Sequence, residues 1–164
     1  IDNEFSLEDL VFSLIPWDRV FFYGDLGAWK STFIRHILRK QLENPDLSVK
    51  SPTYTYYERY SDTANNTNIY HFDLYRIEDF SGFTSIGGEE IAADEKNIML
   101  IEWPERVEGY IEPTRVVRIT LWEKGERLFQ IEDKRTESYC TVMDPVLWIW
   151  GVEWNFSQLL QTSR

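Results

Sequence analysis

The chain has 164 residues, of which 43% are hydrophobic and 27% are charged, and its 28 acidic against 17 basic side chains give a net charge of -11. This length predicts a single domain that spans residues 1–164 and buries a sizeable core. The acidic balance argues against unaided binding to a nucleic-acid backbone, so any role in nucleic-acid metabolism is expected to pass through a protein partner.

Residues 6–15 are predicted to form the first helix. Ser6 is a favourable N-cap, and Pro16 is expected to end the helix near Ile15. The apolar side chains of this segment recur at helical spacing: Leu7, Leu10, Val11 and Leu14. They predict one apolar stripe along the helix.

A phosphate-binding loop is predicted over residues 24–32, which read GDLGAWKST. The template is G-x-x-x-x-G-K-[ST] between a buried strand and a helix, where backbone N–H groups and the helix N-terminus hold phosphate. The apolar run 20–23 supplies the strand, and residues 31–42 have the apolar spacing of the helix. Trp29 replaces the second glycine of the template. The residues expected to contact a nucleotide are Gly24, Asp25, Leu26, Gly27, Ala28, Trp29, Lys30, Ser31 and Thr32.

Short strands and turns alternate through the rest of the chain. The strands expected there span residues 54–60, 69–72, 97–102, 116–121 and 128–132. A turn is expected at 62–68, a loop-rich stretch around 82–88, a short helix at 89–94, and a hairpin about Gly125 between the last two strands. The last twenty residues have no assigned element. Strands interleaved with helices predict an α/β sandwich with a central, partly parallel sheet.

The expected location is the cytoplasm. No apolar stretch approaches the ~18–20 residues of a membrane span, and the acidic start is unlike a signal peptide. The lone cysteine, Cys140, excludes an internal disulfide and suits a reducing compartment. We therefore expect no membrane contact.

Two carboxylates, Asp73 and Glu102, each end an apolar run and are candidates for a magnesium site. Ligands of open α/β sheets lie at the carboxyl ends of the strands, so both acids are expected to converge on the phosphate loop. There they could hold Mg²⁺ together with the hydroxyl of Ser31. The alternative is that each is a solvated charge at a strand end. His71, two residues before Asp73, is expected to be a hydrogen-bonded structural residue rather than a base.

Four ordered motifs resemble those of the TsaE family, also called YjeE: GDLGAWKSTF, VKSPTYT (49–55), YHFDLYR (70–76) and IEWPER (101–106). The set is far more specific than a phosphate loop alone. The resemblance covers residues 5 to about 122, whereas the segment from about 133 onward resembles no family that we can name. It implies a P-loop NTPase-like three-layer sandwich around a central mixed, partly parallel sheet.

The resemblance also implies an ATPase that takes ATP and Mg²⁺ as cofactors. Lys30 would contact the β- and γ-phosphates, Ser31 would bind Mg²⁺, and Thr53 would sense the γ-phosphate or the metal. Asp73 and Glu102 match the family acids associated with Mg²⁺ and hydrolysis, so the implied catalytic residues are Lys30, Glu102 and Asp73. The implied role is to support the TsaB–TsaD pair in forming threonylcarbamoyladenosine at adenosine 37 of tRNAs that read codons beginning with A. Contact with tRNA would be indirect.

Trp17 and Trp29 stand where members of this family commonly carry glycine. An indole at position 29 would have to swing out of the loop or occupy the space of the ligand. Seven Trp beside eight Gly is unusual, since glycine normally supplies ~7% of residues. Three explanations of these tryptophans compete: a degenerate loop, a substitution, or a decoding artefact. In the last, the source organism reads UGA codons as glycine, but the chain was made or translated with tryptophan at those codons. The last of these is our hypothesis, with Trp17 and Trp29 as its best candidates.

Two other functions fit parts of the pattern. A nucleotide-independent adaptor would keep the fold and the partner surface but fail to bind ATP because of Trp29. A small-molecule P-loop kinase would share the loop and the sheet, although the sequence shows no arginine-rich lid.

Overall fold

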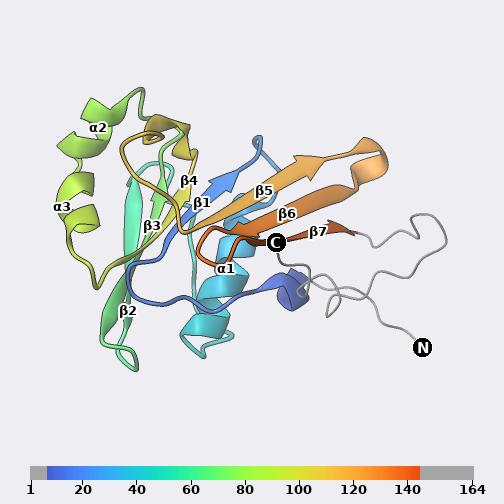
Figure 1. Cartoon of the computed structure of the whole chain (residues 1–164), viewed down its shortest axis with the longest axis horizontal. Coiled ribbons are helices and arrows are strands. Elements are labelled where there is room, and N and C mark those ends of the chain that lie inside the picture. The colour runs from blue at the N-terminus through green and yellow to red at the C-terminus, as the bar shows by residue number, and fades with distance from the viewer. Residues whose placement is uncertain (1–6, 145–164) are drawn as a thin grey trace.

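The computed structural model describes residues 7–144. The strands are β1 (Arg19–Tyr23), β2 (Tyr57–Asp62), β3 (Thr67–Asp73), β4 (Ile98–Glu102), β5 (Arg115–Leu121), β6 (Arg127–Asp133) and β7 (Ser138–Asp144). The helices are α1 (Lys30–Gln41), α2 (Phe80–Ser85) and α3 (Gly88–Ala93), with short 3-10 helices η1 (Leu7–Leu10), η2 (Pro104–Arg106) and η3 (Glu123–Gly125). Figure 1 shows their arrangement. Within residues 7–144, no helix is long and apolar enough to cross a membrane.

The strands form one seven-stranded sheet in the order β2-β3-β4-β1-β5-β6-β7. The pairs β3-β4, β4-β1 and β1-β5 are parallel, whereas β2, β6 and β7 join antiparallel at the two flanks. This mixed sheet confirms the predicted α/β class. The parallel strands β1, β3 and β4 end side by side, and the register pairs Asp73 with Glu102 and Glu102 with Phe22. The two predicted acids and the start of the phosphate loop therefore share one edge of the sheet.

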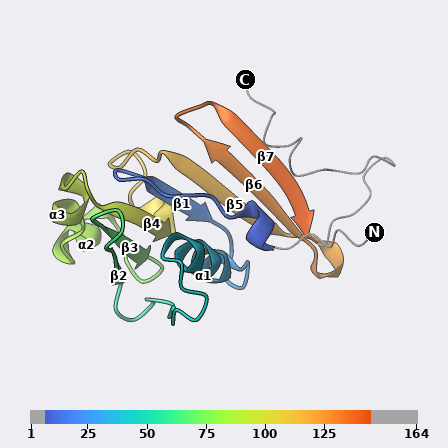
Figure 2. The same cartoon turned by 90° about the horizontal axis from the view of Figure 1, so that it is seen from below.

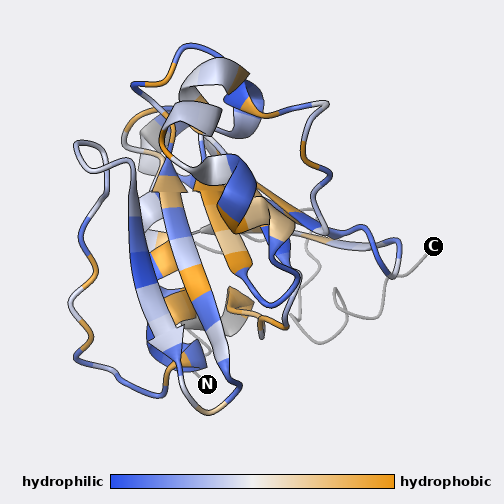
Figure 3. Ribbon diagram, turned by 90° about the vertical axis from the view of Figure 1, so that its left-hand side faces the viewer, coloured by the Kyte–Doolittle hydropathy of each residue, from blue (hydrophilic) through white to orange (hydrophobic). Residues whose placement is uncertain are grey.

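Helices cover both faces of the sheet. In β4, Ile98 and Leu100 belong to the apolar cluster that includes α1, whereas Met99 and Ile101 belong to the cluster of α2 and α3. Successive residues of a strand face opposite sides, so β4 is buried on both faces and reads as a continuous apolar run. Figure 2 shows α1 on one side of the sheet, and Figure 3 shows the edge strand β2 as largely hydrophilic. Three layers result.

Phe33 anchors α1 to the sheet. Its ring makes edge-type contacts with Phe22 of β1 at 6.2 Å, with Phe129 of β6 at 5.9 Å and with Phe12 at 6.1 Å between centroids. Such pairs add to the free energy that burial of the rings already contributes. The first turn of α1, where the phosphate loop ends, is thereby fixed relative to β1.

The predicted helix over 6–15 is wrong. The structure has only the 3-10 helix Leu7–Leu10 followed by irregular chain, and Ser6 lies outside the described residues. The whole predicted stripe is nevertheless buried against α1 and the sheet. The amide of Leu14 donates to the side chain of Gln41 and its carbonyl accepts from the same side chain, while the amide of Ile15 donates to Asp18. These partners satisfy backbone groups that a helix would otherwise satisfy, so the segment can bury its apolar residues without helical structure.

Two elements were not predicted. The stretch expected to be loop-rich contains α2, whose N-cap Asp79 accepts from the amide of Gly82 at 3.0 Å. The segment from 133 onward contains β7, which pairs with β6. The first aromatic strand begins at Tyr57 rather than at residue 54, because a turn precedes it. In that turn Tyr56 has a left-handed φ of 69°, and its amide donates to the carbonyl of Pro52. The predicted hairpin between β5 and β6 is confirmed.

Candidate functional site

The loop that connects β1 to α1 packs tightly against β5. A Cβ atom on Gly24 would lie 2.8 Å from the carbonyl oxygen of Ile119 and 3.1 Å from Cβ of Ala28, so position 24 has no room for a side chain. The loop turns at Gly27, which has a φ of 78°, and the amide of Ala28 donates to the carbonyl of Asp25 at 3.0 Å. Gly24, the one glycine that remains from the template, and Gly27 thus each have a structural reason.

The N-terminus of α1 is suited to an anion. No side chain caps the helix, and its first turn holds no acidic residue. The first amides of an α-helix have no partner within the helix, and its dipole places partial positive charge there. Ser31 and Thr32, both half-buried, lie in this first turn. These free amides are what phosphate binding at a helix start requires.

Lys30 is folded into the loop rather than extended into solvent. The residue is only 5% exposed, its ammonium group donates to the carbonyl of Gly24, and Nζ lies 3.8 Å from the ring centroid of Trp103. Burial lowers the pKa of Lys30, and the negative charges of Glu102 and Asp73 oppose that shift. Both predicted acids therefore act on the loop lysine.

Glu102 connects the end of β4 to the start of α1. The hydroxyl of Ser31 lies 3.0 Å from each carboxylate oxygen of Glu102. Oε2 of Glu102 also lies 2.6 Å from Nε2 of His71. The prediction that Glu102 approaches the loop hydroxyl agrees with this geometry.

Asp73, at the end of β3, is held by a second group of polar contacts. Thr53 donates its hydroxyl to Oδ2 of Asp73 at 2.8 Å, and the hydroxyl of Ser51 lies 3.5 Å from the same oxygen. The amide of Tyr75 donates to Oδ1 at 3.0 Å. The SPTYT segment is thus tied to the carboxyl edge of the sheet through Asp73.

The donors gathered at this edge suit Mg²⁺. Ser31, Asp73 and Glu102 offer a hydroxyl and two carboxylates, which are the hard oxygen ligands that this ion prefers. Among residues 7–144, no three His, Cys, Asp or Glu side chains form a metal cage. Mg²⁺ commonly takes one or two carboxylates and completes its shell with phosphate oxygens and water.

The remaining loop residues lie as follows. Asp25 and Leu26 are exposed, whereas Ala28 is buried. Sequence reasoning missed the contact between His71 and Glu102. The sequence did contain a signal for this contact. His71 and Asp73 are two residues apart on one strand and therefore share a face, and Asp73 was already expected to lie near Glu102.

Trp29 occupies a backbone conformation that favours glycine. Its φ is 77°, in the left-handed region, where a side chain costs ~1–2 kcal/mol. The indole is 39% exposed and lies against Arg127 of β6, whose Cζ is 3.7 Å from the ring centroid. Position 29 thus has the conformation of the glycine that the template requires.

Trp17 occupies a second such position. The amide of Asp18 donates to the carbonyl of Ile15 at 3.1 Å, which closes a turn with Pro16 and Trp17 at its centre. Pro at the second position and a φ of 75° at the third are the features of a type II turn, whose third residue is typically glycine. Trp103 of the EWP motif also has a positive φ, of 58°, so a positive φ alone does not mark a replaced glycine. Trp17 and Trp29 differ from it because they stand in a type II turn and in the phosphate-loop template.

These conformations make a prediction about the gene. If tryptophan stands for misread glycine, codons 17 and 29 of the native gene are expected to be UGA. Sequencing of the gene checks this directly, together with mass spectrometry of the protein purified from its source, which should show glycine at both positions. UGG at both codons would exclude the hypothesis. The weaker candidates for misread glycine are Trp122, whose φ of -106° is open to any residue, and Trp148, Trp150 and Trp154, which lie outside the described residues.

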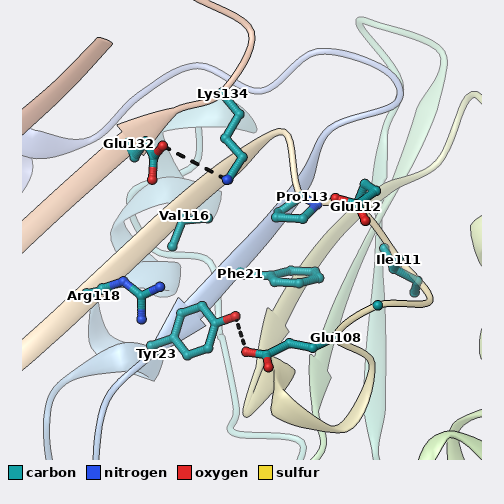
Figure 4. A pocket seen from close by; sticks show the side chains of 11 residues that line it. Phe21, Tyr23, Glu108, Ile111, Glu112, Pro113, Val116, Arg118, Glu132 and Lys134 are labelled. Carbon is teal, nitrogen blue, oxygen red and sulfur yellow. Dashed lines mark hydrogen bonds and ion pairs between the residues drawn. The ribbon is translucent and has the colours of Figure 1, made fainter. Parts of the chain in front are cut away.

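A separate hollow of about 200 Å³ lies beside β1 and β5 and contains no residue of the phosphate loop. In this hollow (Figure 4), the hydroxyl of Tyr23 donates to Glu108 at 2.5 Å, and the ammonium group of Lys134 pairs with Glu132 at 4.0 Å. Burial raises the pKa of Tyr23, and the hydrogen bond to Glu108 raises it further. The hollow is smaller than the ~300–1,000 Å³ of typical small-molecule sites.

The phosphate loop lies at the carboxyl edge of a partly parallel sheet, the place where P-loop proteins bind nucleotides, and this assigns the chain to the P-loop class. The profile of the family described as "Threonylcarbamoyl adenosine biosynthesis protein TsaE" matches residues 4–135. The chain belongs to the TsaE family, a P-loop ATPase family of tRNA threonylcarbamoyladenosine biosynthesis.

Individual relatives agree with this assignment. A protein of Rickettsia felis named "tRNA threonylcarbamoyladenosine biosynthesis protein TsaE" is 35% identical over 127 residues, which are 77% of this chain and 71% of the relative. The protein of the same name from Haemophilus influenzae is 40% identical over 92 residues, 56% of this chain and 55% of the relative. The crystal structure of Bacillus subtilis YdiB aligns with a TM-score of 0.51 at 24% identity, covering 75% of this chain and 71% of YdiB. This last likeness supports the fold.

Proposed function

We propose that the chain binds Mg-ATP in residues 24–32 and hydrolyses it in the cytoplasm, in support of threonylcarbamoyladenosine formation at adenosine 37 of tRNA. The observation that carries the proposal is the contact of Ser31 with Glu102 beside the buried ammonium group of Lys30. A hydroxyl, a strand-end carboxylate and a lysine at a helix start are the parts that phosphoryl transfer to water requires.

Each residue has a role in this proposal. Lys30 leaves the carbonyl of Gly24 to contact the β- and γ-phosphates, and the loop amides add further donors. Ser31, Asp73 and Glu102 would hold Mg²⁺, which would neutralise charge on the phosphate oxygens. Of the two acids, Glu102 orients the attacking water.

Thr53 gives the SPTYT segment a way to respond to the nucleotide. Its hydroxyl donates to Asp73 in this structure. We propose that this hydroxyl turns toward the γ-phosphate or the metal when Mg-ATP is bound. Movement of the segment would then report the state of the nucleotide to a partner.

Trp29 favours a second candidate, an adaptor that does not bind nucleotide. Residue 29 stands where the template requires glycine for the close approach of the backbone to the phosphates, and its left-handed φ adds strain. In that reading, this polypeptide keeps the fold and the partner surface of the family with an impaired site.

We propose that the partners are TsaB and TsaD and that tRNA is contacted only through them, in keeping with the net charge of -11. The chain alone is expected to hydrolyse ATP slowly, and TsaB and TsaD of the same organism should raise the rate by about 10-fold or more. The reason is that a partner can complete or order the site, and one positioned charge-stabilising group commonly changes kcat ~10²–10³-fold. Phosphate release by the Trp29→Gly variant, with and without both partners, measures this.

Pull-down with TsaB and TsaD, with and without ATP, separates the enzyme from the adaptor. An enzyme should bind in a nucleotide-dependent manner, whereas an adaptor should bind equally well in both conditions. A Trp29→Gly protein that turned over as fast alone as in the complex would contradict the dependence on partners.

A further inference from the structure

His71 is the one imidazole beside the candidate site, and it is 0% exposed. It lies in β3 opposite Leu100 of β4, two residues before the position where Asp73 pairs with Glu102. Alternate residues of a strand share a face, so His71 lies with Asp73 and Glu102 on the side of the sheet that α1 covers. The neighbouring ring of Phe72 packs on the opposite side, against Phe83 of α2 at 5.5 Å.

The contact of His71 with Glu102 fixes the tautomer of the ring. Nε2 lies 2.6 Å from Oε2 of Glu102, and a carboxylate can only accept a hydrogen bond. Nε2 therefore carries the proton. Nδ1 is buried and has no hydrogen-bond partner within residues 7–144, so a second proton there would be an unsatisfied buried donor.

Glu102 has few other groups to hold it. Its carboxylate is 3% exposed, and its other hydrogen-bond partner within the described residues is the hydroxyl of Ser31. In the proposed function, Ser31 would share its hydroxyl with Mg²⁺, which leaves His71 as the hydrogen-bond partner of Glu102 that is not a metal ligand. The bond from His71 comes from a fully buried residue inside the sheet.

We infer that His71 is a positioning residue that aims the carboxylate of Glu102 at the phosphate loop through its Nε2–H bond. The inference rests on the proposed function, because it concerns the orientation of a group that acts in hydrolysis. It assigns a role to a side chain that sequence reasoning treated as structural. Buried partners of this kind commonly change activity ~10–100-fold when they are removed.

Two replacements of similar size separate positioning from packing. His71→Gln keeps an N–H donor near the place of Nε2, whereas His71→Met fills the same space without a donor. In the Trp29→Gly background, His71→Met should lower kcat for ATP hydrolysis by about 10- to 100-fold, with KM for ATP within about 3-fold. His71→Gln should recover most of the rate. Equal losses in both variants, in proportion to the folded fraction, would show that the residue only packs.

A second measurement needs no activity. The chain has two histidines, so nitrogen NMR of the labelled imidazoles, with a His36→Gln variant for assignment, reads the tautomer of His71 in the nucleotide-free full chain. A proton on Nε2 is expected, and an Nε2 that carries no proton would overturn the inference. If the Trp29→Gly protein hydrolyses no ATP, the proposed function fails, while this spectrum still decides whether His71 donates to Glu102.

Discussion

Replacement of Trp29 by glycine is expected to tighten Mg-ATP binding about 10- to 100-fold, the equivalent of one hydrogen bond to a charged group. The backbone at position 29 is already left-handed, so glycine relieves strain there without changing the course of the chain. It also removes a bulky side chain, packed against Arg127, from the residue where the template requires glycine. Isothermal titration of both proteins with Mg-ATP measures the difference.

Trp17→Gly is the matched control for this experiment. It makes the same exchange at a left-handed position, but at the opposite end of the five-residue strand β1, roughly 17 Å from the loop. It should stabilise the fold and change ATP affinity by less than about 2-fold, since distant sites act independently. Equal affinities of the parent protein and the Trp29→Gly variant would show that the loop tolerates the indole.

Glu102→Gln is expected to lower kcat for ATP hydrolysis about 100- to 1,000-fold in the Trp29→Gly background, which is the usual cost of losing one precisely placed charge or dipole. The amide keeps the size of the side chain but loses the negative charge needed by the metal and the attacking water. Because Lys30 and the loop amides remain, the affinity for ATP should change little. Single-turnover hydrolysis beside equilibrium binding separates the two effects.

Glu105→Gln provides the comparison. Glu105 lies three residues after Glu102 in the same motif and is exposed. Like Glu102, it raises the pKa of Lys30 through its negative charge. Its neutralisation should leave kcat within about 2-fold, because charges exposed to solvent are screened. Similar losses in the two variants would mean that Glu102 contributes only to the local electrostatic field, and the proposed catalytic role would then be wrong.

The position of the candidate site could be predicted because it depends on local signals. The order of apolar strand, glycine loop and amphipathic helix is written in consecutive residues, and Asp73 and Glu102 each follow an apolar run. Parallel strands bring their carboxyl ends to one edge, so the approach of both acids to Lys30 follows from the topology. The roles of these residues in catalysis stay predictions.

Other features depend on contacts between distant segments. The segment before β1 buries its apolar residues without forming the predicted helix. Gln41 of α1 contributes to this, because its side chain pairs with both the amide and the carbonyl of Leu14. Arg127 of β6 packs against the indole of Trp29, although the two residues are 98 positions apart in the sequence. No local sequence pattern predicts this contact. β7 adds to the flank of the sheet beyond the motifs of the family, where the sequence offered no assignment.

The central claim is that residues 24–32 form a Mg-ATP site, and a calorimetric titration of the Trp29→Gly variant with and without Lys30→Ala tests it most directly. Lys30 is buried at the helix start but belongs to neither apolar cluster, so its truncation should remove phosphate contacts and leave the fold intact. Saturable binding by the Trp29→Gly variant, weakened about 10-fold or more by Lys30→Ala, is the expected result. Binding that Lys30→Ala leaves unchanged, or no binding by either folded variant, would contradict the claim.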